Sequence, residues 1–194
     1  MSVKIYGSNR IDLDGNNETF SIRATADDEL NFYKGASTKL MGIDASGFES
    51  KPNIPAFYAY LDSPYSDAAL GVIACNIAQI NTGGYYNTTN YAFTAPIAGN
   101  YFVSCHLSGY TTDTQGDDSQ WLGIYINNIS WGGNAGSRSS MNNLRYHTTS
   151  GVELTVSWSA IVYLEFGDFI QMFYGDVQSN TTVSNANFIG YLIG

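Results

Sequence analysis

The stretch VELTVSWSAIVYLEF, residues 152–166, constrains the fold of this chain more than any other segment. Apolar residues recur at every second position, which is the period of a β-strand with one buried face. The residues of this parity are Val152, Leu154, Val156, Trp158, Ala160, Val162, Leu164 and Phe166. The opposite parity begins polar and becomes apolar at Ile161 and Tyr163. We therefore expect Ile161 and Tyr163 to be covered as well, either by a neighbouring subunit or by a second sheet of the same chain.

The same period of two recurs elsewhere, and no segment has a sustained helical period. Residues 91–107 predict a strand, a turn bracketed by Pro96 and Gly99, and a second strand with one apolar face. That face holds Tyr101, Val103, Cys105 and Leu107, and the other face holds Ser104, His106 and Ser108. The final ANFIGYLIG is apolar on both faces, as expected of a central strand between layers or at a subunit interface. Many short strands with Gly and Asn turns indicate an all-β sandwich or jelly roll.

Composition limits the classes of partner. Charged residues make up only 13% of the chain, and the net charge is −9 without any basic run. Binding to nucleic acid or to an anionic membrane surface depends on clustered cations, so we expect neither partner. No apolar run approaches the length of a membrane span, so we expect no membrane insertion. The first residues, MSVKIYGSNR, lack the apolar core of a signal peptide, and we expect assembly in a cytoplasm.

Residues 1–50 differ from the rest and predict a β-rich N-terminal segment for attachment or a shaft. Short strand-like pieces there end at Gly, Asn or Asp; they are VKIYG, IDLDG, TFSIRAT, ELNFYKG and KLMGIDASG. Such pieces cannot bury a face alone, and they predict a core shared by three chains. The alternative is a hairpin extension packed on the following domain. Prolines at 52 and 55 predict a linker over 51–55, followed by a second domain over 56–194.

Four motifs within 56–194 resemble the globular head of complement C1q and its tumour-necrosis-factor-like relatives. They are NTGGYYN at 81–87; Tyr91, Phe93, Pro96, Gly99, Tyr101 and Phe102; Leu164, Gly167 and Asp168; and Phe188, Gly190 and Leu192. The resemblance implies a ten-stranded jelly roll that forms a homotrimer, which leaves no free sheet edges. Residues expected to pack the core or the trimer are Tyr91, Phe93, Tyr101, Phe102, Trp158, Ile161, Tyr163, Phe188, Tyr191 and Leu192.

The segment LNFYKGASTKLMGIDASG, residues 30–47, resembles the shafts and attachment segments of phage tail-fibre proteins in composition. Together with a C1q-like head and no collagen Gly-X-Y stalk, this implies a structural protein of a bacteriophage virion. It would be a trimeric fibre or appendage subunit, bound to other virion proteins through its N-terminal segment and to a host-surface glycan or receptor through its head. The alternatives are a capsid decoration or cementing trimer and a soluble carbohydrate-binding module.

No residue pattern predicts catalysis, so we expect neither an enzyme nor a cofactor. Neither His106 nor His147 accompanies a nucleophile motif, and Glu153 and Glu165 are too far apart along an extended segment for a glycosidase pair. A hydrolase is therefore the least favoured alternative. Cys75 and Cys105 both lie in apolar strand patterns. Two reduced buried thiols and a disulfide between facing strands both stay open.

Two loops hold residues suited to a ligand. Three acidic residues in TTDTQGDDSQ would suit a structural calcium ion, and a solvated loop is the alternative; they are Asp113, Asp117 and Asp118. Aromatic rings beside Asn and Arg suit sugar recognition by stacking and directed hydrogen bonds. The residues that carry this hypothesis are Tyr110, Trp121, Trp131, Arg138, Asn142, Arg145 and Tyr146. The alternative is that they are core or ordinary loop residues.

Overall fold

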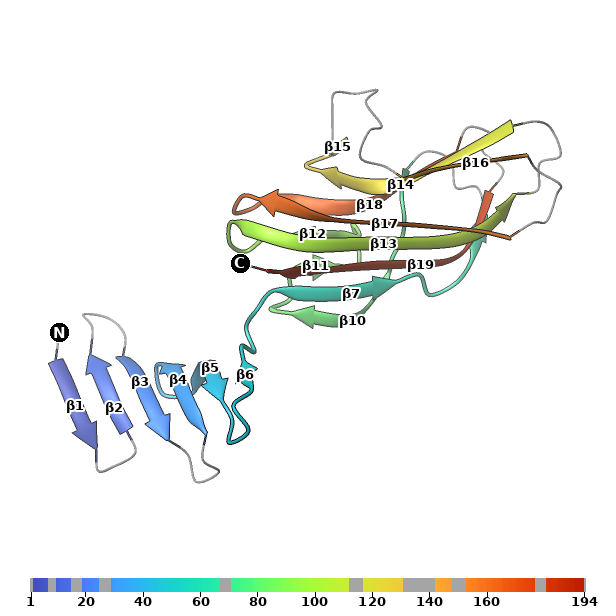
Figure 1. The fold of residues 1–194 in the computed structure, drawn as a ribbon. Coiled ribbons are helices and arrows are strands. Elements are labelled where there is room, and N and C mark those ends of the chain that lie inside the picture. Colours follow the sequence, from blue (N-terminus) through green and yellow to red (C-terminus); the bar gives the residue numbers. More distant parts are fainter. Residues whose placement is uncertain are drawn as a thin grey trace. The chain divides into compact units, whose positions relative to one another are not determined.

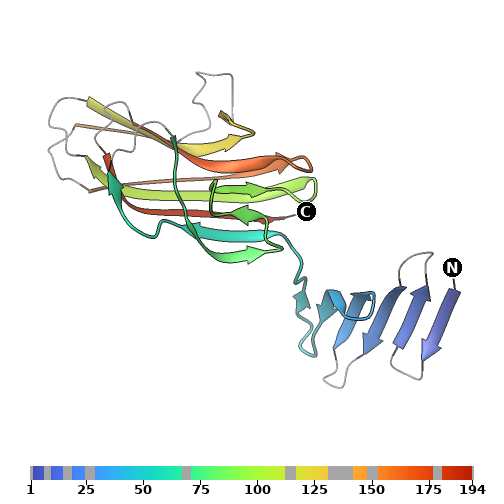
Figure 2. The ribbon, with the colours of Figure 1, turned by 180° about the vertical axis from the view of Figure 1, so that it is seen from behind.

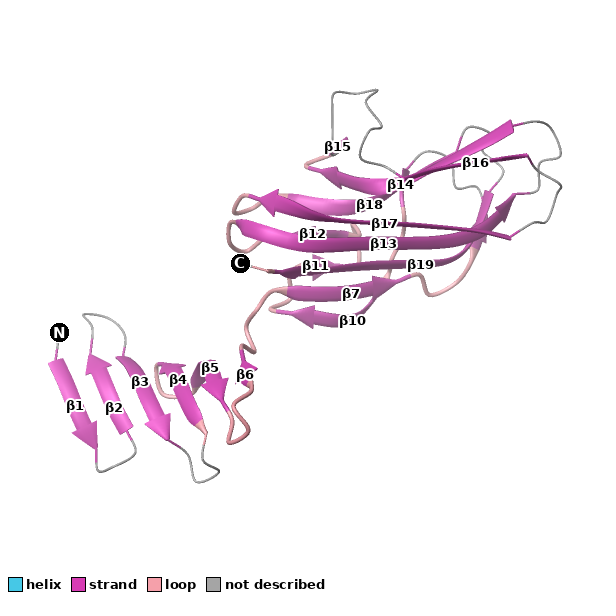
Figure 3. Cartoon of the chain, viewed as in Figure 1, coloured by secondary structure: helices cyan, strands magenta, loops and turns pink. Residues whose placement is uncertain are grey.

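The computed structural model describes residues 2–6, 10–14, 19–24, 29–66, 71–111, 117–130, 142–147, 153–176 and 181–193, and these ranges contain strands and loops without any helix (Figure 3). Accordingly, the described residues include no helix that could cross a membrane. The chain divides into two compact units, Met1–Ile54 and Pro55–Gly194.

The first unit is a six-stranded antiparallel sheet in which each strand pairs with the next (Figure 1). Its strands are β1 (Ser2–Tyr6), β2 (Arg10–Asp14), β3 (Thr19–Ala24), β4 (Leu30–Lys34), β5 (Thr38–Ile43) and β6 (Glu49–Ser50). The β4–β5 turn uses Gly35 at φ +66°, a left-handed conformation that glycine adopts without a Cβ penalty. A bulge interrupts the pairing of β4 with β5 after Phe32.

The second unit packs two sheets against each other (Figures 1 and 2). The first sheet has the order β10–β7–β19–β13–β17, with β8 paired to β19; its strands are β7 (Ala56–Tyr60), β8 (Tyr65–Ser66), β10 (Ile77–Thr82), β13 (Gly99–Thr111), β17 (Glu153–Leu164) and β19 (Thr181–Leu192). The second sheet has the order β11–β12–β18–β14–β15, with β9 on β18 and β16 on β14. Its strands are β9 (Gly71–Val72), β11 (Tyr86–Asn87), β12 (Ala92–Thr94), β14 (Asp117–Ile126), β15 (Ile129–Ser130), β16 (Asn142–His147) and β18 (Phe169–Asp176).

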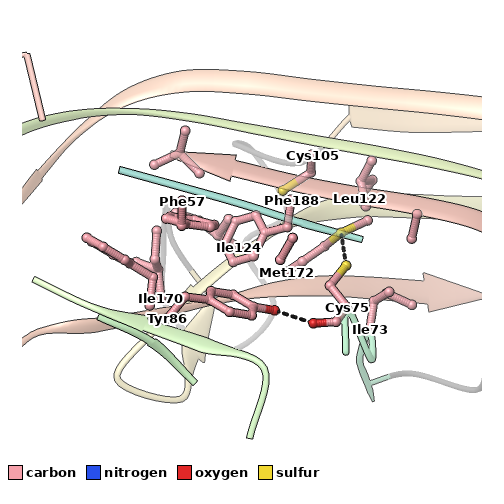
Figure 4. Close-up of a cluster of buried hydrophobic side chains, with 14 of the residues drawn as sticks. Phe57, Ile73, Cys75, Tyr86, Cys105, Leu122, Ile124, Ile170, Met172 and Phe188 are labelled. Atoms are coloured by element: carbon pink, nitrogen blue, oxygen red, sulfur yellow. Dashed lines mark hydrogen bonds between the residues drawn. The ribbon is translucent and has the colours of Figure 1, made fainter. Parts of the chain in front are cut away.

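The core between the two sheets is rich in stacked aromatic rings (Figure 4). The Phe57 ring lies 4.7 Å from that of Phe93 and 4.8 Å from that of Phe188, measured between ring centroids. Tyr86 keeps its hydroxyl satisfied inside this core by donating a 2.8 Å hydrogen bond to the carbonyl oxygen of Cys75. A buried tyrosine hydroxyl needs such a partner, because an unpaired polar group costs free energy in an apolar interior.

The faces predicted for the strand after Pro96 are confirmed with one exception. In β13, Tyr101, Val103, Cys105 and Leu107 are all buried in the core. Ser104 and His106 lie on the other face as predicted, whereas Ser108 is buried, and the β13–β19 pairing bulges directly after it.

The long alternating strand is confirmed as β17, but the prediction that Phe166 is its last core residue is wrong. Val156, Val162 and Leu164 are buried, and Trp158 and Ala160 pack against the core. Phe166 lies beyond the strand, in the β17–β18 turn, and is 78% exposed. The period of two continues through Phe166 in the sequence, but the chain turns at Gly167, whose φ is +88°, and takes Phe166 out of the sheet.

Both cysteine thiols are free and buried, so the disulfide alternative is wrong. Cys75 and Cys105 both point into the core (Figure 4), where the Cys75 thiol lies 4.0 Å from the sulfur of Met172. The Cys105 thiol lies 3.7 Å from the carbonyl oxygen of Gly123. Burial raises the pKa of the Cys75 thiol to about 12, and it raises the pKa of Cys105 as well.

Candidate functional site

The outward face of the first sheet is the most distinctive surface of the second unit. We call it the outer aromatic face and define it by Tyr58, Phe102, Ile161, Tyr163 and Tyr191. Strands β7, β13, β17 and β19 supply these residues, which alternate with core residues along each strand. Ile161 is 62% exposed, Tyr163 57% and Tyr191 45%. Exposed aliphatic and aromatic side chains gathered on one sheet face are typical of an interaction site.

The strand register sets three of these residues side by side. Tyr191 of β19 pairs with Phe102 of β13, which pairs in turn with Ile161 of β17. The rings of Phe102 and Tyr191 are 5.3 Å apart and tilted by 38°. Tyr163 is two residues beyond Ile161 on the same face of β17. The apolar end of the face is therefore continuous across three neighbouring strands.

Further along the same strands, the face becomes polar. The His106 Nδ1 atom lies 2.9 Å from the hydroxyl of Ser157, and the Tyr58 hydroxyl donates a 3.0 Å hydrogen bond to Oδ1 of Asn187. Asn187, His106 and Ser157 occupy one row of the register. Side chains of this polar end are therefore hydrogen-bonded to one another, whereas at the apolar end Phe102 and Tyr191 contact each other through their rings.

The ten residues predicted to pack the core or a trimer fall into separate groups. Phe93, Tyr101 and Phe188 are fully buried in the core of the single chain, and Trp158 and Leu192 pack against it. Phe102, Ile161, Tyr163 and Tyr191 belong to the outer aromatic face. Tyr91 is half-buried in the turn before β12, at φ 58°. Ile161 and Tyr163 are 62% and 57% exposed, so the other sheet of the second unit does not cover them, and cover by a neighbouring subunit stays a prediction.

Sequence reasoning missed Tyr58, Ile80 and Ile193 as surface residues. Tyr58 pairs with Ile189 on one side and with Ile80 on the other, and Ile80 and Ile193 are about half exposed. A signal was present in AFYAY, because Phe57 and Ala59 are buried while Tyr58 and Tyr60 alternate with them. A tyrosine pattern of this kind does not by itself say which parity faces the core, since tyrosine suits both environments.

The residues predicted to bind sugar are only partly placed. Tyr110, at the end of β13, is exposed, and Trp131 and Arg138 lie outside the described residues. The remaining four lie on the neighbouring strands β14 and β16; they are Trp121, Asn142, Arg145 and Tyr146. In their register, Arg145 pairs with Ser119 and Tyr146 with Asp118. The two predicted loops are thus brought to one pair of strands at the edge of the second sheet.

The acidic candidates do not form a described metal centre. Asp113 lies outside the described residues, and Asp117 and Asp118 begin β14 opposite His147 and Tyr146. Among the described residues, no group of three or more His, Cys, Asp or Glu gathers in one place. Calcium binding at this loop stays a prediction.

Glu153 and Glu165 are separated by the whole length of β17. A twelve-residue strand spans about 40 Å, whereas paired glycosidase carboxyls lie roughly 5–10 Å apart. These two carboxylates therefore do not form a glycosidase pair within one chain.

Comparisons with solved structures give the fold. The globular domain of the zebrafish complement 1qA protein matches with a TM-score of 0.51 and 18% identity over 72% of this chain and 98% of that one. Murine APRIL, in crystals at pH 5.0, matches with a TM-score of 0.44 and 10% identity over 70% of this chain and 98% of that one. No family model matches the sequence, and no curated protein does. The chain is an all-β protein whose second unit has the jelly-roll fold of the C1q globular domain.

Proposed function

We propose that this chain is a homotrimeric structural protein of a bacteriophage virion, without enzymatic activity, whose jelly-roll head contacts the host surface. The observation that supports the trimer is the uncovered outer aromatic face. Ile161, Tyr163 and Tyr191 are each about half exposed, and burying the remainder of three such side chains would stabilise an assembly by about 3 kcal/mol per chain. Three-fold closure covers this face in every copy and leaves no copy with an open one.

The virion role rests on the composition of the chain and on its two-unit organisation. Only 13% of the residues are charged, so a large share of the polar surface is Asn, Ser, Thr and Tyr. Among its described residues, the first unit has no buried large apolar side chain, which suits an attachment or shaft segment that is completed by other subunits. The head would then be displayed in three copies per trimer and in many copies per particle.

Host contact would use the loops near Tyr110 and the β14–β16 strands. Display in multiple copies converts weak single contacts into strong binding, because later contacts form at high effective concentration. Aromatic and amide side chains suit a glycan, which offers apolar ring faces and hydroxyl groups. The net charge of −9 disfavours acidic polysaccharides, so a neutral glycan is the expected class.

A glycan array with the purified full chain tests this role. We expect binding to neutral glycans, and we expect Tyr110→Ala to weaken it at least five-fold, since roughly 1 kcal/mol of ring contact is lost. Tyr85→Ala is the matched control, because Tyr85 and Tyr110 are both 38% exposed and Tyr85 lies outside these loops. Failure to bind any glycan, together with binding to purified capsids and an increase in capsid stability, would instead favour the decoration or cementing trimer.

A further inference from the structure

The first unit has an inverted pattern of burial. Its buried side chains are polar: Asp12, Ser21 and Asn31 are between 1% and 3% exposed. Its large apolar residues remain accessible, with Ile11, Phe20 and Leu30 between 39% and 43% exposed. No large apolar residue among those described in this unit is buried. A sheet of this kind has one finished face and one face that still lacks its cover.

The polar face is closed by its own side chains. Arg10 donates two hydrogen bonds to the Asp12 carboxylate, at 2.7 and 2.5 Å. The Arg23 Nε atom donates to the Ser21 hydroxyl at 3.1 Å, while its guanidinium lies 4.4 Å from the centre of the Tyr33 ring. The two arginine side chains therefore pair with Asp12 and Ser21 on this face, whereas Oδ1 of the buried Asn31 has no hydrogen-bond partner among the described residues. This face suits direct contact with water.

The opposite face carries an unbroken row of apolar residues. Cross-strand pairs in register run through β2 to β5 and join Ile11, Ile22, Phe32 and Met41. Leu13 and Phe20 form a neighbouring pair, as do Leu30 and Ile43. We call this surface the apolar row face. The charged residues described on it lie at its margins, with Lys34 at the end of β4 and Glu49 on β6. An apolar centre with a charged rim is the usual arrangement of a protein interface.

We propose that the apolar row face packs against the same face of other copies of this chain, so that the N-terminal sheets of a trimer share one core. The apolar centre, which is both aliphatic and aromatic, has no polar group that would select a different protein, and its margins carry one charge of each sign, Lys34 and Glu49. In a cyclic assembly of identical chains, the same face is buried against a neighbouring copy in every subunit. This inference rests on the proposed homotrimer.

The apolar row face is of a size that suits contact between copies already joined through their second units. Strands of five or six residues in a six-stranded sheet give a face of about 18 Å by about 24 Å, or roughly 400 Å². A stable interface between free proteins needs about 800 Å² per partner. The row is therefore too small to join free chains alone. It is sufficient for copies tethered through their second units, where the effective concentration is high.

Cross-linking of the full chain tests the inference. Ile22→Cys places a thiol in the middle of the row, and Ile11→Cys places one at the neighbouring position. Ser50→Cys is the control, because Ser50 is exposed and its register places it on the polar face beside Gly42 and Asn31. The two native cysteines are buried in the core, and mild oxidation joins only thiols whose Cα atoms come within about 7 Å, so a disulfide between chains, seen without reductant, reports contact at the introduced thiol. We expect covalent dimers from Ile22→Cys and Ile11→Cys on a denaturing gel, and at least ten-fold fewer from Ser50→Cys.

Each outcome supports or overturns the inference. The inference would be overturned if neither row variant gave covalent dimers, or if all three variants gave equal amounts of dimer. An apolar row face that packs on the second unit of its own chain would give no dimers. Light scattering on the same samples separates this from the proposed function. A trimer that does not cross-link in the row overturns only the shared N-terminal core. A monomer that does not cross-link overturns the proposed homotrimer as well.

Discussion

Gly190 lies where β19 crosses the Phe57 ring, and it leaves no room for another atom. A Cβ added there would lie 2.5 Å from Cε1 of Phe57 and 3.4 Å from the carbonyl oxygen of Phe102. Phe57 is itself stacked on Phe93 and packs edge to face with Phe188. The glycine of the C-terminal Phe–x–Gly–x–Leu motif is thus explained by a close approach between a strand backbone and a core ring.

Gly190→Ala is expected to destabilise the protein by about 1–3 kcal/mol, because the stacked Phe57 ring has little freedom to move. Urea unfolding followed by tryptophan fluorescence measures the change. Phe57→Leu removes the ring atoms that the new methyl would meet, so the double variant should lose less stability than the sum of the two single variants. Full additivity of the two losses would refute the proposed clash.

The buried thiol of Cys75 predicts a loss of stability at alkaline pH. Burial raises its pKa from 9.0 to about 12, so above pH 9 the unfolded chain releases a proton that the folded chain keeps. The contribution is fully present below pH 9 and is lost progressively between pH 9 and about 12. The urea midpoint should therefore fall between about pH 8 and about pH 11, and Cys75→Ala should reduce this fall. If the urea midpoint fell equally with pH in the parent chain and in Cys75→Ala, ionisation of Cys75 would not be its cause.

At the scale of elements, two turns are joined by one hydrogen-bond network. Asp168, in the β17–β18 turn, accepts from the side chain of Asn127 at 2.7 Å and from the backbone N–H of Glu165 at 2.9 Å. Asn127, in the β14–β15 turn, accepts in return from the backbone N–H of Phe169 at 3.0 Å. The Gly–Asp pair recognised in the sequence therefore fixes the geometry of both turns.

Asp168→Ala should cost about 1–2 kcal/mol, since hydrogen bonds to a charged group are lost at a partly exposed site. Asp168→Asn is the matched variant, because its amide oxygen still accepts from one partner, and it should lose about half as much. Thermal unfolding of the three proteins gives the comparison. Equal melting temperatures for Asp168→Ala and the parent chain would show that the network contributes nothing to stability.

The sequence predicts elements best where one face is buried along a whole strand. The alternation in β13 and β17 predicts both strands and their core residues, because a period of two reports directly on burial. It fails at Phe166, where a turn rather than the pattern decides exposure. It also cannot separate Phe93, which is in the core, from Tyr163, which is on the surface, because both are aromatic residues in apolar segments. Of the outer aromatic face, the sequence predicted Phe102, Ile161, Tyr163 and Tyr191 as packing residues, whereas it missed Tyr58.

At the scale of the whole molecule, the two units share one property: each has an apolar sheet face that its own described residues leave uncovered. In the second unit this is the outer aromatic face, and in the first it is the apolar row face. Both faces belong to sheets whose other side is already closed, by the core in one unit and by arginine side chains in the other. In each unit, one side of the sheet is therefore covered by the unit's own side chains and the other side is not.

Ile161→Asp should break the trimer without unfolding the head. A carboxylate buried in an apolar interface without a partner is strongly unfavourable, whereas at a 62% exposed position of a single chain it is tolerated. The matched control is Ile97→Asp, since Ile97 is 48% exposed but lies in a turn rather than on this face. Sedimentation velocity should show a shift to monomers for Ile161→Asp alone. Trimers that persist in both variants would exclude the outer aromatic face as the interface.

The mass of the unmodified chain in solution tests the central claim most directly. Light scattering at low micromolar concentration should give three times the 21.1 kDa of one chain, with no monomer at equilibrium. A stable, folded monomer of 21.1 kDa under the same conditions would contradict the claim that both sheet faces are covered by copies of this chain.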